Sequence, residues 1–190
     1  MMDAKSLAAL CTGLSDAFSY PTRALPSLAF AAALAADGVQ PPDAAETPTL
    51  EALQVEHTRL FINSLPEVPC PPYGSIYLEG CCMSGSTVAI GAVYRRLGIE
   101  SDELPDHIAV EFEFLSLLLP AVDVVTQDQR ADVGEIIRHL AAWTPQFFAR
   151  VREHDRSGFY RSAAETGKET IALLRDYAEQ TMPAPTAVDS

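Results

Sequence analysis

The sequence predicts an all-α protein, a single helical-bundle-like domain of about eight or nine helices. Ala and Leu are abundant, whereas runs of aromatic and β-branched residues are sparse, which favours helix over strand. Apolar residues recur at spacings of three and four along most of the chain, and no stretch has the alternation of a strand. The 190 residues fit one domain, which we place at residues 1–182, followed by a disordered tail over 183–190.

Three helices are expected in the first third of the chain. The first ends near Tyr20–Pro21, and its apolar face carries Leu7, Leu10, Leu14 and Phe18. An Ala-rich second helix is expected over residues 26–36, followed by a proline-rich loop over 39–48. A third helix is expected over 49–63, with one face formed by Leu50, Leu53, His57, Leu60 and Phe61.

Residues 64–83 interrupt this helical pattern. They contain four prolines and two glycines, so that a continuous helix is excluded and an irregular segment with at most one short turn is expected. A loop of this length in a helical domain is more often functional than not. Its residues Tyr73 and Tyr77 either contact a peptide, including by stacking on arginine, or plug the core. We expect the segment to be a mobile binding element.

Five further helices are expected after this segment. Ser84 is expected to cap a helix that ends before Gly98 and whose inward residues are Val88, Val93, Tyr94 and Leu97. The next is expected to begin at Pro105, with Asp106 in its first turn and a core stripe of Ile108, Phe112, Leu115 and Leu119.

The last part of the chain is expected to hold a helix marked by Val133, Ile136, Ile137, Leu140 and Trp143. Pro145 is expected to start a separate short helix, and Ser157–Gly158 to break the chain before a final helix over about 159–180.

Composition restricts the class of partner. With 26 acidic and 13 basic residues the formal net charge is −13, which should repel nucleic acid and anionic membrane surfaces and attract basic peptides. The same charge is also explained by solubility alone. No signal peptide and no segment of transmembrane length is recognised, so we expect a cytoplasmic protein without stable membrane insertion.

The sequence predicts neither a metal site nor a cofactor. Cys11, Cys70, Cys81 and Cys82 match no common zinc spacing, and in a reducing compartment we expect free thiols. The glycine-containing stretch over residues 80–85 lacks the lysine that a phosphate-binding loop needs.

Three groups of polar residues are candidate functional sites. Asp106 and His107 form either a binding or acid–base pair, or a helix-end carboxylate beside a solvated histidine. Glu111 and Glu113 lie between apolar residues and are expected to be solvated or paired with an arginine such as Arg59, Arg95 or Arg96. His57 is expected at the core edge, with its ring satisfied by a backbone carbonyl, or in a binding site.

Several motifs in order resemble one family. They are E-x-x-x-L-F at residues 56–61, P-P-Y-x-S-x-Y at 71–77, E-x-P-D-H at 103–107 and E-F-E-F-L at 111–115. Towards the C-terminus follow H-L-x-x-W at 139–143, F-F at 147–148 and G-F-Y at 158–160. Together they resemble the TorD/DmsD family of cytoplasmic redox-enzyme maturation chaperones, over about residues 7–177.

The resemblance implies an all-helical, non-enzymatic protein. It implies binding of the twin-arginine signal peptide and the body of a molybdopterin oxidoreductase precursor, with export delayed until the cofactor is inserted. The peptide-binding residues that it implies are His57, Leu60, Phe61, Pro72, Tyr73, Tyr77, Pro105, Asp106 and His107, to which the acidic cluster adds Glu111. We expect Asp106→Asn and His107→Ala to weaken peptide binding more than the fold.

Two other classes of protein stay open at this point. One is a helical enzyme that uses Asp106 and His107 as an acid–base pair, which would need a third oriented group and an enclosed pocket. The other is a helical adaptor without leader specificity. Both a monomer and a homodimer are compatible with the sequence.

Overall fold

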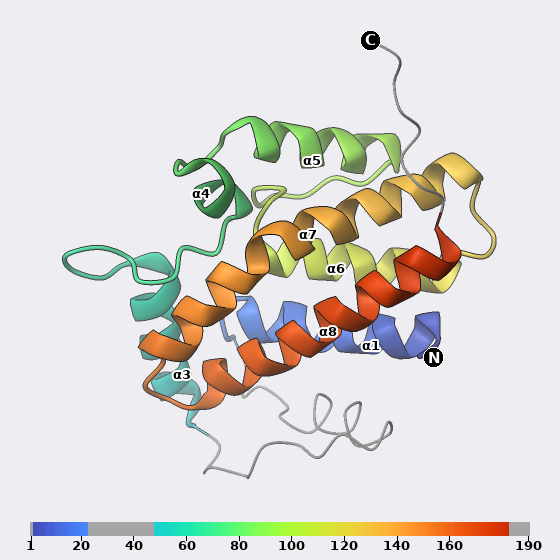
Figure 1. Ribbon diagram of the computed structural model, residues 1–190. Helices are drawn as coiled ribbons and strands as arrows, with labels where there is room; N and C mark the ends of the chain where they lie inside the picture. The colour runs from blue at the N-terminus through green and yellow to red at the C-terminus, as the bar shows by residue number, and fades with distance from the viewer. Residues whose placement is uncertain (1, 23–47, 183–190) are drawn as a thin grey trace.

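The computed structural model describes residues 2–22 and 48–182 and is all-helical over these ranges (Figure 1). Its α-helices are α1 Ala4–Phe18, α3 Leu50–His57, α4 Gly74–Glu79, α5 Gly85–Arg96, α6 Ile108–Leu118, α7 Gln127–His154 and α8 Phe159–Thr181. The described residues contain no strand, only an isolated bridge between Tyr73 and His107. The all-α class is therefore confirmed, while the helix predicted over 26–36, the loop after it and the C-terminal tail lie outside the described residues.

The longest two helices, α7 and α8, run antiparallel and cross the molecule side by side (Figure 1). Gly158, with a φ of 77°, makes the left-handed turn that reverses the chain between them. Helices α1 and α6 pack on each other next to this pair. The centre of the core is aromatic. Its largest fully buried side chains are Phe18, Phe112, Trp143, Phe147 and Tyr160.

Helix α3 continues into a π-helical turn over Thr58–Ile62, so the helix predicted over 49–63 is confirmed. In this turn the Asn63 N–H donates to the Thr58 carbonyl at 2.8 Å. The wider turn leaves the Leu60 carbonyl free to accept a hydrogen bond from the Cys70 N–H at 3.0 Å. This contact ties the start of the proline-rich segment to the end of the helix.

Helix α7 passes through Pro145 without a break, so the prediction of a separate short helix there is wrong. The same buried stripe continues on both sides of the proline, through Trp143 before it and Phe147 and Val151 after it. The Thr144 hydroxyl donates to the Leu140 carbonyl at 2.7 Å. Burial of a continuous apolar face outweighs the hydrogen bond that a proline removes.

The segment over residues 64–83 is more regular than expected, because its second half contains α4. Tyr77 of α4 is half-buried and stacks on Trp143, with ring centroids 5.5 Å apart. The expected irregular structure is confined to residues 63–73 and to the turn over 80–84. Leu65, in the first of these stretches, is almost fully exposed.

Two other local predictions are wrong. Helix α6 begins at Ile108 with His107 as its N-cap, so Pro105 and Asp106 precede the helix. Val88, predicted to face inward from α5, is 66% exposed, whereas Val93 and Tyr94 are buried as expected. The core stripe of α6 is confirmed, since all four of its members are fully buried, namely Ile108, Phe112, Leu115 and Leu119.

Candidate functional site

The fold brings the proline–tyrosine motif and the proline–aspartate–histidine motif together. The Ile108 N–H donates to the Pro72 carbonyl at 2.9 Å, and the Gly74 N–H donates to the Asp106 carbonyl at 2.9 Å. These two bonds form the antiparallel bridge between Tyr73 and His107, whose ring centroids are 5.2 Å apart. Backbone hydrogen bonds therefore hold together two motifs that lie about thirty residues apart in the sequence.

Asp106 is fully buried at this junction. Its Oδ2 accepts a hydrogen bond from the Ser75 N–H at 2.8 Å, in the first turn of α4. Helix α4 has no side-chain cap of its own, so the Asp106 carboxylate caps it from a distant part of the chain. The helix that this carboxylate stabilises is thus α4 and not, as predicted, the one that follows Asp106 in sequence.

His107 caps its own helix. Its Nδ1 accepts a hydrogen bond from the Ala109 N–H at 3.2 Å, which assigns the ring proton of the neutral imidazole to Nε2. Burial lowers the pKa of His107, although Glu103 and Asp106 partly oppose this effect. Since Asp106 is directed at Ser75 and His107 at Ala109, the two side chains do not make the hydrogen bond to each other that an acid–base pair would need.

The accessible part of this junction consists of Tyr73, Glu103 and His107, which we call the Tyr73–His107 surface. Tyr73 and His107 are half-buried and Glu103 is exposed. The pKa of Tyr73 is raised to about 12 by burial and by the nearby charges of Glu103, Cys82 and Asp106. A carboxylate beside an aromatic face is a combination that a guanidinium group can use, through an ion pair and a cation–π contact.

Glu111 is fully buried beneath α4. Its carboxylate accepts from the Trp143 indole N–H at 3.1 Å and lies 2.8 Å from Nδ1 of His139. The expectation of a solvated carboxylate or an arginine pair is therefore wrong for Glu111, whereas Glu113 is exposed as expected. Burial raises the pKa of Glu111, and the carboxylate in turn outweighs the effect of burial on His139 and raises the pKa of that imidazole.

His57 lies at the core edge, as one of the two expectations stated. Its Nε2 is 3.3 Å from the Phe18 carbonyl oxygen, and its ring contacts those of Tyr20 and Phe61. Burial lowers the pKa of His57 to about 4, with a further contribution from the charge of His107. The imidazole is therefore neutral at neutral pH.

The other predicted peptide-binding residues are buried or half-buried. Leu60, Phe61 and Pro72 are buried, and Pro105 accepts a hydrogen bond from the Tyr94 hydroxyl through its carbonyl. Tyr77 lies between Trp143 and Arg150, whose guanidinium carbon is 5.6 Å from the centre of the Tyr77 ring. Tyr77 therefore packs as a core plug, the second of the two expectations. Direct peptide contact by these residues stays a prediction.

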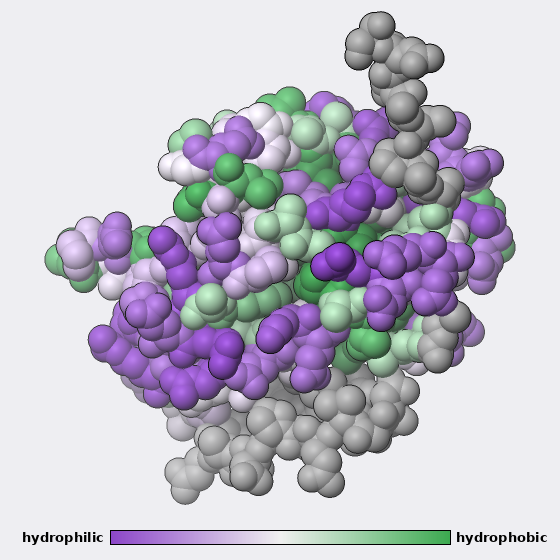
Figure 2. Space-filling model, viewed as in Figure 1, coloured by the Kyte–Doolittle hydropathy of each residue, from purple (hydrophilic) through white to green (hydrophobic). Residues whose placement is uncertain are grey.

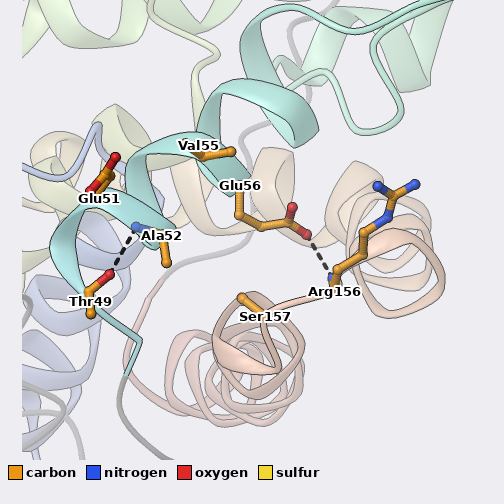
Figure 3. Close-up of a pocket in the computed structure, with 7 residues that line it drawn as sticks. All are labelled: Thr49, Glu51, Ala52, Val55, Glu56, Arg156 and Ser157. Atoms are coloured by element: carbon orange, nitrogen blue, oxygen red, sulfur yellow. Dashed lines mark hydrogen bonds between the residues drawn. The ribbon is translucent and has the colours of Figure 1, made fainter.

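A pocket of about 490 Å³ lies elsewhere, between the start of α3 and the turn that follows α7 (Figure 3). It is lined by Thr49, Glu51, Ala52, Val55, Glu56, Arg156 and Ser157. Glu56 accepts from the Arg156 N–H at 2.7 Å and pairs with Arg59, so its carboxylate is used within the fold. None of these lining residues was predicted to bind peptide, although Glu56 begins the E-x-x-x-L-F motif. The i, i+3 spacing of Glu56 and Arg59 is the signal in the sequence for their ion pair.

The described residues contain no cluster of three or more histidine, cysteine or acidic side chains arranged to hold a metal ion. None of the helices in the same part of the chain is long and apolar enough to cross a bilayer.

In this all-helical fold, the carboxylates and imidazoles of Asp106, His107 and Glu111 make their hydrogen bonds within the protein. Comparison with known proteins identifies the family. The nitrate reductase delta subunit family profile matches residues 15–149. A solved structure of an Archaeoglobus fulgidus protein, assigned as a redox enzyme maturation protein, is 30% identical and superposes with a TM-score of 0.58, covering 88% of this chain and 93% of that one.

Two curated relatives are TorD chaperones. The Aliivibrio fischeri protein is 33% identical over 120 residues, which are 55% of this chain and 54% of the relative. The Vibrio parahaemolyticus protein is 24% identical over 106 residues, which are 50% of this chain and 49% of the relative. The chain thus spans about half the length of the curated relatives that it matches.

The chain belongs to the nitrate reductase delta subunit and TorD chaperone family of redox enzyme maturation proteins. This membership confirms the predicted family, whose TorD chaperones are non-enzymatic.

Proposed function

We propose that this protein binds the twin-arginine signal peptide and the body of a molybdopterin oxidoreductase precursor in the cytoplasm. In this role it assists cofactor insertion and delays export until the client is mature. The family supports a client of this class, and the sequence resemblance supports the leader as one of the two parts that are bound. The chaperone acts as a monomer or a homodimer and needs no cofactor of its own.

The observation that carries the proposal is the Tyr73–His107 surface. Hydrogen bonds between the two motifs already hold the backbone of this surface in place. Binding of a ligand would therefore not have to overcome the entropy cost of ordering that backbone. Tyr73 and Glu103 together offer a π face and an accepting carboxylate, which match the planar, five-donor guanidinium of arginine. We assign the leader arginines to this surface.

An apolar surface next to it suits the hydrophobic part of a leader. Leu78, Met83 and Val88 are exposed, and they follow Tyr73 closely along α4 and the start of α5. Figure 2 shows hydrophobic residues over α4 and the beginning of α5 on a face that is otherwise largely hydrophilic. A peptide with arginines followed by an apolar stretch would complement the two surfaces in that order.

Calorimetric titration of a twin-arginine leader peptide tests the proposal. Removing one charge or one aromatic face from the Tyr73–His107 surface, by Glu103→Gln or Tyr73→Ala, is expected to weaken binding by about tenfold, or roughly 1.4 kcal/mol. Glu113→Gln removes another exposed acid, from α6, and is expected to leave the affinity unchanged. A leader with lysines in place of both arginines should bind more weakly, because lysine lacks the planar fork.

Equal losses from Glu103→Gln and Glu113→Gln would show that net charge alone attracts the peptide and would refute the assigned surface. Capture of a client from the native host that does not require its leader would instead favour the adaptor without leader specificity.

A further inference from the structure

The Glu111 carboxylate of α6 is fully buried, and side chains of α7 surround it. Its Oε1 accepts a hydrogen bond from the indole N–H of Trp143 at 3.1 Å, and its Oε2 lies 2.8 Å from Nδ1 of His139. Both oxygens are thus engaged within the protein. The carboxylate therefore fixes the positions of two neighbouring rings on α7.

Helix α4 rests directly on these two rings. A Cβ at Gly74 would lie 2.9 Å from His139 Cε1 and 2.9 Å from Trp143 Nε1. The second of these atoms is the one that donates to Glu111. Further along α4, Tyr77 stacks on Trp143 with ring centroids 5.5 Å apart. A rotation of either ring towards α4 would therefore displace that helix, because closely packed side chains leave no space to absorb the movement.

The position of α4 decides where Tyr73 lies. Tyr73 is the N-cap of α4 and directly precedes Gly74. The Gly74 N–H donates to the carbonyl of Asp106 at 2.9 Å, and the Ser75 N–H donates to the carboxylate of Asp106 at 2.8 Å. The first turn of α4 is thus held by the hydrogen bonds of Asp106 and by contact with the rings that Glu111 fixes.

Stability alone does not explain a carboxylate at this buried position. Removing a charge from water costs free energy, and replacing a buried ion pair by apolar residues of similar volume is often neutral or stabilising. Hydrogen bonds to a charged group add direction, which apolar contacts lack, so a carboxylate with two partners sets the orientation of both. This favours a role for Glu111 in placing the rings of His139 and Trp143.

We propose that Glu111 is a positioning residue for the leader site. Through the rings of His139 and Trp143 it holds α4 in place, and with α4 it holds the aromatic face of Tyr73 where a guanidinium group stacks. The inference rests on the proposed function, because it gives Glu111 an indirect part in leader binding. The buried carboxylate acts on affinity without touching the peptide.

The test is calorimetric titration of the twin-arginine leader peptide into the full-length protein and its variants. Glu111→Leu leaves the indole and the imidazole without their partner and should weaken binding by about three- to tenfold. Glu111→Gln keeps an amide oxygen for the indole N–H and should retain most of the affinity. Leu174→Ala, which removes a fully buried side chain from α8, should lower the melting temperature and leave the affinity unchanged.

Two further measurements separate ring placement from general stability. The chain has one tryptophan, so its proton–nitrogen NMR spectrum has a single indole signal. That signal should move in Glu111→Leu, where the hydrogen bond is lost, and stay close to its wild-type position in Glu111→Gln. Gly74→Ala pushes α4 away from the same two rings without changing Glu111, and it should weaken leader binding to a similar extent.

The outcomes distinguish this inference from the proposed function. A wild-type protein that binds no leader would refute both. Leader binding by wild type with the same affinity in Glu111→Leu or in Gly74→Ala would refute the positioning role alone. A similar loss of affinity in Leu174→Ala would also overturn that role, since affinity would then follow stability in general and not the position of α4.

Discussion

Asp106 stabilises the fold through a carboxylate that solvent does not reach. It joins the segment before α6 to the first turn of α4, using its carbonyl for Gly74 and its Oδ2 for Ser75. Asp106→Ala is therefore expected to lower the free energy of unfolding by about 1.5–3 kcal/mol, the range for a hydrogen bond to a charged group. Urea denaturation followed by circular dichroism measures this value.

His107→Ala serves as the comparison for Asp106→Ala, because it removes the cap of α6 and the ring contact with Tyr73 but no buried carboxylate, and it should cost about 1 kcal/mol. Because Asp106 caps α4, its expected contribution to the fold is larger than that of His107, while the expected loss of peptide binding in both variants stays a prediction. A stability for Asp106→Ala within about 0.5 kcal/mol of wild type would show that its carboxylate does not hold α4.

His57 makes the fold sensitive to acid. Its pKa falls from an ordinary value of 6.5 to about 4 on folding, so the unfolded chain binds a proton more readily than the native one between these values. Stability should therefore decline as the pH falls from 6.5 towards 4, by up to about 3 kcal/mol from this residue. His139 adds nothing to this window: Glu111 raises its pKa above 6.5, so its contribution is lost only at higher pH.

Urea unfolding at several pH values between 4 and 7 measures how the free energy of unfolding of His57→Gln depends on pH. His154→Gln, which changes an exposed histidine at the end of α7, is the control. The first variant should flatten the acid dependence and the second should leave it unchanged. An identical slope in both variants would exclude His57 as the source.

At the scale of elements, α4 connects the segment before α6 to α7, because it is bonded to Asp106 and packs against Trp143. It packs so closely that a Cβ on Gly74 would lie 2.9 Å from both His139 Cε1 and Trp143 Nε1. Gly74→Ala is expected to cost about 1–3 kcal/mol through overpacking and to alter the fluorescence of Trp143, the only tryptophan in the chain.

Gly85→Ala is the matched control for Gly74→Ala, since a Cβ there would meet its nearest atom, on Glu79, at an ordinary 3.4 Å. Its stability and fluorescence should match those of wild type. Unchanged fluorescence in Gly74→Ala as well would mean that α4 can move away from α7 without disturbing Trp143.

At the scale of the whole molecule, the net charge of −13 sets the range over which a basic leader is attracted. Charges on exposed surfaces are screened over about 8–10 Å at physiological ionic strength, so leader affinity should fall as salt is raised. Calorimetry at low and high salt measures the change. A leader with both arginines replaced by glutamine should bind weakly, with little dependence on salt, and an equally steep dependence for both peptides would contradict an electrostatic role for the arginines.

The sequence by itself determined the helical class, the core stripe of α6, the glycine breaks at residues 98 and 158 and the family, because these depend on local periodicity and on residues in order. Only the tertiary structure decided what the polar residues do. Asp106 caps a helix about thirty residues away, and Glu111 pairs with His139 and Trp143. It also decided that α7 continues through Pro145. These outcomes depend on which surfaces meet in space: a buried carboxylate takes whichever donor the packing brings to it, and spacing along the chain does not contain that information.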